Sequence, residues 1–155
     1  MRHFYIWVSS GFGIGWLPLA PGTWAAAVAI LPLLWFTHSP FALRNAVLLA
    51  LIAVFTLLGA KAAHYLSAEW GEDPRQIVLD EMVGVWVAVI GCPWQWQYLL
   101  AGFILFRFFD IVKPLGIKRA EHLKRGWGVM ADDLLAGLYA NVVIQFFIFT
   151  IGIIN

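Results

Sequence analysis

The chain has 155 residues, of which 62% are hydrophobic and 12% are charged, and its formal net charge is +1. Soluble domains average roughly 45–50% apolar and 25% charged residues, so this composition excludes an ordinary soluble domain and predicts one domain in a bilayer. No basic run resembles a nucleic-acid-binding tract. The single cysteine, Cys92, excludes an intramolecular disulfide and any multi-cysteine metal site.

The apolar segments predict an all-α, polytopic membrane helix bundle formed by residues 1–155 as one domain. A helix needs about 20 residues to cross a hydrocarbon core of about 30 Å, and three of the segments are shorter than that. We therefore expect four to five spans, some of them short or re-entrant, and we expect Thr23 to N-cap the first. In chain order the segments are Trp24–Phe36, Leu43–Tyr65, Asp80–Gly91, Gln97–Val112 and Leu134–Ile154.

The charged residues collect in two blocks, Lys61–Glu81 and Arg107–Asp133, and five alternating spans place both on the same side of the membrane. Eight of the ten Lys and Arg residues then lie on that side, which the positive-inside rule assigns to the cytoplasm. If Trp24–Phe36 is re-entrant instead, four spans put the blocks outside or require a rearranged N-terminus. We favour five crossings, with every carboxylate facing the cytoplasm.

Two adjacent carboxylates, Asp80 and Glu81, open the third segment, and Gly84 follows one turn later. One acid there would complement the helix dipole, but two adjacent acids repel each other. The missing side chain at Gly84 leaves room beside Asp80 for a ligand or another helix. The pair can therefore stabilise the helix end or supply oxygen ligands to a hard cation.

Three charges, Arg107, Asp110 and Lys113, are spaced so that they share one helix face at the end of the fourth segment. They can form a self-contained ladder of ion pairs. Alternatively, Arg107 and Lys113 can bind phosphate, because guanidinium donates two parallel hydrogen bonds and ammonium supplies a point charge.

A second acidic pair, Asp132-Asp133, precedes the last apolar segment, with Gly137 four residues after Asp133. N-capping of a helix is again the simpler interpretation, with Asp132 as the cap. The five carboxylates and the two cations Arg107 and Lys113 leave three uncompensated negative charges, which would repel phosphate. One or two Mg²⁺ ions would offset them, and Mg²⁺ prefers carboxylate, water and phosphate oxygens. The five carboxylates are Asp80, Glu81, Asp110, Asp132 and Asp133.

A glycine-rich stretch, Gly11–Gly15, is followed by Pro21-Gly22-Thr23. It lacks the lysine of a nucleotide-binding phosphate loop. Two interpretations stand: an interfacial turn, or a helix start whose backbone N–H groups and Thr23 bind an anion.

In their order and spacing, the motifs together resemble the phosphatidylglycerophosphatase A family of bacterial membrane phosphatases. The resemblance runs over nearly the whole chain. It implies Mg²⁺-dependent removal of the terminal phosphate from phosphatidylglycerophosphate at the inner membrane, with membrane lipids as partners and no nucleic acid. The matching stretches are Gly11-Phe12-Gly13-x-Gly15 through Pro21-Gly22-Thr23, Asp80-Glu81-x-x-Gly84, Phe106-Arg107-x-x-Asp110-x-x-Lys113-Pro114, and Gly128-Val129-Met130-x-Asp132-Asp133-x-x-Ala136-Gly137.

We accordingly expect four carboxylates to bind the metal, with Asp110 completing the catalytic set. Substrate phosphate is assigned to Arg107, Lys113 and Thr23. Alternatives left open are an aspartyl-phosphate intermediate, a different lipid substrate such as phosphatidate or a polyprenyl phosphate, and a non-enzymatic cation-binding transport subunit. The sequence does not give the number of metal ions or the oligomeric state. The four expected metal ligands are Asp80, Glu81, Asp132 and Asp133.

Overall fold

The computed structural model of the chain describes residues 1–71, 74–114, 116–120, 122–124 and 126–154. Residues 151–154 are described by their backbone alone. Within these ranges the fold contains helices and no strand, which confirms the all-α prediction. The elements are α1 (Arg2–Ser9), η1 (Ile14–Trp16), α2 (Pro21–Ile30), η2 (Leu31–Phe36), α3 (Phe41–Trp70), α4 (Leu79–Val89), α5 (Trp96–Val112), α6 (Ile117–Ala120) and α7 (Trp127–Ile154).

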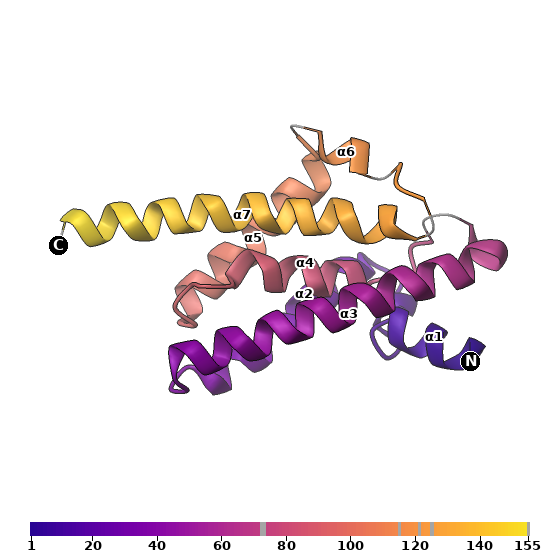
Figure 1. Cartoon of the computed structure of the whole chain (residues 1–155), viewed down its shortest axis with the longest axis horizontal. Helices are drawn as coiled ribbons and strands as arrows, with labels where there is room; N and C mark the ends of the chain where they lie inside the picture. The colour runs from indigo at the N-terminus through magenta and orange to yellow at the C-terminus, as the bar shows by residue number, and fades with distance from the viewer. Residues whose placement is uncertain (72–73, 115, 121, 125, 155) are drawn as a thin grey trace.

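The two longest helices, α3 and α7, run lengthwise through the molecule, and α4 lies between them (Figure 1). Both are long and apolar enough to cross a bilayer, α3 over all of its 30 residues and α7 over Trp127–Thr150. Many of their large apolar side chains point outward, as Val54 of α3 and Phe146 of α7 do. Such a surface suits lipid rather than water.

The other three predicted spans are short. Among the described residues only α3 and α7 have the length and composition of a span, so the expectation of four to five is met in part. Helix α4 has 11 residues and α5 has 17. The predicted helix Trp24–Phe36 changes at Leu31 into the 3-10 segment η2, where Pro32 lacks the N–H that would continue the α-helix.

Two predicted helix starts are wrong. Helix α2 begins at Pro21 with Ala20 as its N-cap, so Thr23 lies inside the helix. The fixed φ of proline suits the first position of a helix. Helix α7 begins at Trp127, so Asp132 does not cap it. The buried side chain of Met130 packs against Gly59 of α3, and this contact favours a helix that starts earlier.

Helix α4 is the centre of the core. It packs against α7, α2, α3 and α5, and its residues Val83, Val85 and Val89 are fully buried. Gly84 fits between α5 and α7, because a Cβ there would overlap the Phe106 ring. The space that Gly84 provides is therefore occupied by another helix, which was one of its two predicted uses.

Candidate active site

Three of the predicted metal ligands meet where the first turn of α4 faces the second turn of α7. Oxygen atoms of Asp80, Glu81 and Asp133 all lie within 4.8 Å of one another. Asp80 and Asp133 are buried, and Glu81 is partly buried. Asp80 and Glu81 occupy the first turn of α4, as the sequence predicts. We call these three side chains the carboxylate cluster.

Some acceptor oxygens of the carboxylate cluster are not used in hydrogen bonds within the described part of the chain. Among the described residues, Glu81 Oε2 and Asp133 Oδ2 are buried without a hydrogen-bond partner. Asp80 Oδ1 accepts a hydrogen bond from the backbone N–H of Glu81 at 3.1 Å. Burying like charges side by side is costly unless a cation or protons compensate them. Crowded carboxylate oxygens are also the ligands that a hard divalent cation prefers, so this donor set fits Mg²⁺.

The predicted ladder on α5 is only partly present. Arg107 Nη1 lies 2.7 Å from Asp110 Oδ2, one turn along the helix. Lys113 follows the last helical residue in a left-handed conformation with φ 46°, and its Nζ lies 2.6 Å from Asp132 Oδ2 on α7. The two cations are thus held by different carboxylates on different helices.

These ion pairs border the carboxylate cluster. Asp110 is close enough to Asp133 to interact with it electrostatically, and Arg107 is close enough to Glu81 to attract it. The buried Arg107 Nε has no hydrogen-bond partner among the described residues. A partly buried guanidinium with an unused donor beside a cation site is a suitable contact for a phosphate oxygen.

The first turn of α2 covers the other side of the carboxylate cluster. A Cβ at Gly22 would overlap Glu81 Oε1, so only glycine lets α2 approach this closely. Thr23 is the next residue and is partly buried. The role of Gly22 was not predicted, because the Pro-Gly-Thr motif indicates a helix start without indicating what packs against it.

The glycine-rich stretch packs against the segment that leads into α4. A Cβ at Gly15 would overlap the backbone carbonyl of Gln76, and one at Gly11 would lie 3.2 Å from Val78 and 3.3 Å from Met82. The backbone N–H of Val78 donates to the carbonyl of Ser9 at 2.9 Å. These contacts favour the interpretation of this stretch as a turn, one that positions the start of α4.

Comparison with known proteins gives the family. A model of the family described as phosphatidylglycerophosphatase A matches residues 7–148. The chain belongs to this family. The resemblance noted in the sequence is thereby confirmed, and family membership supports phosphatidylglycerophosphatase activity, the hydrolysis of a phosphoric monoester.

Three bacterial relatives align with most of the chain. A Bacteroides thetaiotaomicron protein, provisionally named a phosphatidylinositol-3-phosphatase, is 45% identical over 150 residues and 94% of both chains. Phosphatidylglycerophosphatase A of Haemophilus influenzae is 41% identical over 86% of this chain and 82% of its own. The Escherichia coli protein of the same name is 32% identical over 88% and 78%. No solved structure matches the chain.

Proposed function

We propose that this single-domain membrane protein removes the terminal phosphate of phosphatidylglycerophosphate in an Mg²⁺-dependent reaction at the cytoplasmic membrane face. The products are phosphatidylglycerol and inorganic phosphate. The observation that carries the proposal is the carboxylate cluster, in which one buried oxygen of Glu81 and one of Asp133 have no hydrogen-bond partner among the described residues. The family supports the substrate, and the clustering of the charged blocks supports the cytoplasmic face.

The metal would be held by Asp80, Glu81 and Asp133, whereas Asp132, the fourth expected ligand, lies outside the carboxylate cluster and pairs with Lys113. A divalent cation supplies, when bound, charge stabilisation at phosphate oxygens and a more acidic water. Burial of the carboxylates between α4 and α7 limits competing water. Asp110 completes the catalytic set by fixing Arg107 through their ion pair.

Arg107 and Lys113 would orient the phosphate. They lie beside the carboxylate cluster, where Arg107 is held by an ion pair to Asp110 and Lys113 by one to Asp132. The planar fork of Arg107 matches two phosphate oxygens. Thr23, in the turn of α2 that covers Glu81, is the third proposed contact. Phosphoryl transfer depends mainly on such positioning and on neutralisation of charge.

A second candidate substrate comes from the Bacteroides thetaiotaomicron relative, whose provisional name specifies a phosphatidylinositol 3-phosphate. Both lipids carry a phosphomonoester on an anionic phospholipid head group. The carboxylate cluster, Arg107 and Lys113 would serve either lipid. Head-group contacts outside these residues would decide between them.

The test is phosphate release by the protein purified in mild detergent, with Mg²⁺ and with EDTA. The substrates are phosphatidylglycerophosphate, phosphatidylinositol 3-phosphate and phosphatidate, and Asp133→Asn serves as the inactive control. We expect Mg²⁺-dependent release that is fastest from phosphatidylglycerophosphate. Faster release from phosphatidylinositol 3-phosphate would support the proposed active site but would change the proposed substrate. Release from no lipid by folded protein would overturn the proposal.

A further inference from the structure

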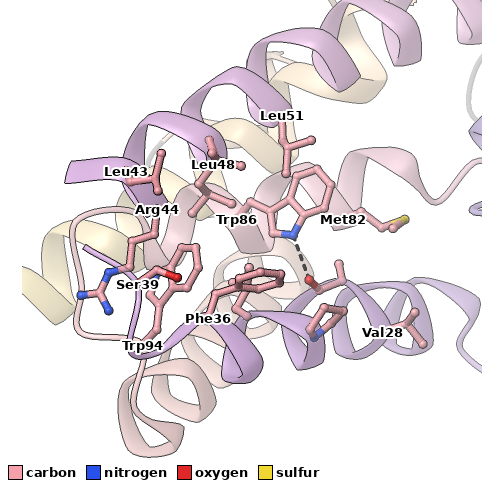
Figure 2. Close-up of a pocket in the computed structure, with 14 residues that line it drawn as sticks. Val28, Phe36, Ser39, Leu43, Arg44, Leu48, Leu51, Met82, Trp86 and Trp94 are labelled. Atoms are coloured by element: carbon pink, nitrogen blue, oxygen red, sulfur yellow. Dashed lines mark hydrogen bonds between the residues drawn. The ribbon is translucent and has the colours of Figure 1, made fainter. Parts of the chain in front are cut away.

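A cavity of about 520 Å³ lies outside the proposed active site, between α2–η2, α3 and α4. Figure 2 shows Val28 and Met82 at one end of it and Arg44, Ser39 and Trp94 at the other. Leu43, Leu48 and Leu51 of α3 line one wall. Cavities of this volume are typical of small-ligand sites.

The cavity opens on an apolar surface. Phe36, Leu43 and Val47 line it and are exposed, so its mouth is surrounded by hydrocarbon side chains. Its wall along α3, from Leu43 to Leu51, is about 12 Å long at the rise of an α-helix. An unbranched hydrocarbon chain suits this length and lining better than a water-soluble molecule does.

Arg44 provides the only charged side chain among the residues that line the cavity. Its guanidinium lies over the rings of Phe41 and Trp94, at 5.1 and 5.4 Å from their centroids, and Nη1 donates to the carbonyl of Thr37 at 3.2 Å. Its Nε is buried without a hydrogen-bond partner, and no ion pair to Arg44 occurs among the described residues. A guanidinium in this state is complementary to an anion.

The Arg44 end of the cavity is remote from the carboxylate cluster. Asn45 Oδ1 accepts a hydrogen bond from the backbone N–H of Gly91 at 2.8 Å, which places the start of α3 beside the end of α4. The cluster lies at the opposite end of α4, about 16 Å away for 11 helical residues. An anion at Arg44 is therefore a second ligand and not the substrate phosphate in the active site.

We propose that the cavity binds a second membrane phospholipid, with one acyl chain between α2–η2 and α3 and its phosphodiester at Arg44. The guanidinium of Arg44, which has no ion pair among the described residues, matches the anionic head group of such a lipid, and the apolar cavity matches its acyl chain. The site faces the membrane surface opposite to the carboxylate cluster, so its ligand comes from the other leaflet if the protein spans the bilayer.

The experiment is native mass spectrometry of the delipidated protein titrated with phosphatidylglycerol. We expect Arg44→Gln to weaken binding of the tightest lipid by about tenfold or more, because a charge-assisted hydrogen bond is lost. Arg44→Lys should retain most of the affinity. Ala29→Leu, which fills the cavity from α2, should also lose the lipid, whereas its matched control Ala27→Leu should not.

Arg107→Ala separates the two sites, because it removes a proposed phosphate contact of the active site and leaves the cavity intact. The proposal predicts that Arg107→Ala still binds the lipid that the wild-type protein binds most tightly. Equal binding by wild type, Arg44→Gln and Ala29→Leu would overturn the proposal, as would loss of that lipid in Arg107→Ala alone. Arg44 stands at the rim of the cavity, so Arg44→Gln stays informative if Ala29→Leu does not fold.

Discussion

Both ends of α4 are buried among polar groups, but these groups are neutral amides at the C-terminal end and carboxylates at the N-terminal end. At the C-terminal end, Asn141 Nδ2 donates to the carbonyls of Ala88 at 3.1 Å and Ile90 at 2.8 Å. Gln145 Nε2 donates to Ile90 as well, at 3.3 Å. These neutral amides satisfy carbonyls that a helix leaves without partners at its end.

At the N-terminal end, the carboxylate cluster leaves oxygens of Glu81 and Asp133 without partners among the described residues. The carbonyls of Ala88 and Ile90 at the C-terminal end accept hydrogen bonds from protein amides, whereas the carboxylates at the N-terminal end need a cation to compensate their charge. The comparison therefore assigns helix stability to the amides at one end and cation binding to the carboxylates at the other, and the following substitutions test that division.

The largest effect should come from Asp133→Asn, which keeps the shape of the side chain and removes its charge. We expect turnover to fall by more than about 100-fold, as for loss of a group that stabilises charge in the transition state. In EDTA the same variant should unfold at a higher temperature than wild type, since repulsion within the cluster is relieved. Phosphate release and thermal unfolding measure the two effects. Near-normal turnover would refute the assignment of Asp133.

Mg²⁺ should stabilise the wild-type protein. A ligand at about 100 times its dissociation constant contributes about 2.7 kcal/mol, which raises the unfolding temperature of a chain this long by roughly 5–10 °C. Asp80→Asn should lose most of this shift, and Arg44→Gln should keep it. An equal shift in Asp80→Asn would mean that the ion binds elsewhere.

Arg107→Ala should act on substrate binding more than on the metal. Loss of a charge-assisted contact to phosphate should raise KM by about tenfold or more, while the Mg²⁺-induced shift in unfolding temperature stays close to that of wild type. Arg107→Lys should recover part of the affinity, because it restores charge without the planar fork. Loss of the Mg²⁺ shift in Arg107→Ala would assign this residue to the metal site instead.

Sequence reasoning selected the candidate residues because charge is rare in this chain and expensive in a bilayer. The first turn of α4, the Arg107–Asp110 pair and the cores of α3 and α7 all lie where periodicity and composition placed them. Each of these features depends on local sequence.

What sequence could not supply depends on tertiary contacts. Asp132 and Asp133 are adjacent on α7 and so point about 100° apart, toward Lys113 and the carboxylate cluster respectively. The early start of α7 and the fit of Gly22 on Glu81 likewise follow from packing between helices. The number of spans is confirmed only in part, because apolar runs such as α4 can fill the core of a protein as well as cross a membrane.

Asn141→Leu tests the C-terminal end of α4, where the amides are expected to contribute stability. The substitution removes both amide hydrogen bonds and leaves the Ala88 carbonyl without this donor, so we expect a loss of about 1–2 kcal/mol in unfolding free energy. Turnover per folded molecule should change little. Val142→Ala, at the neighbouring exposed position, is the control and should have a smaller effect. Lost turnover with unchanged stability would contradict the division between the two ends.

The smallest effect concerns Cys92, which is fully buried just beyond α4 and lies 3.6 Å from Gln145 Nε2. Burial raises the pKa of its thiol to about 11, because the charged thiolate is poorly solvated there. At neutral pH roughly one thiol in a thousand or fewer is then ionised, so maleimide should label the folded protein slowly, faster as pH rises, and rapidly after unfolding. A cysteine at exposed position 118, made by Lys118→Cys in a Cys92→Ala background, is the matched control and should react at once. Cys92→Ala itself should leave turnover nearly unchanged, because this end of α4 contributes packing and not chemistry; a large loss of turnover would extend the functional site along the whole helix.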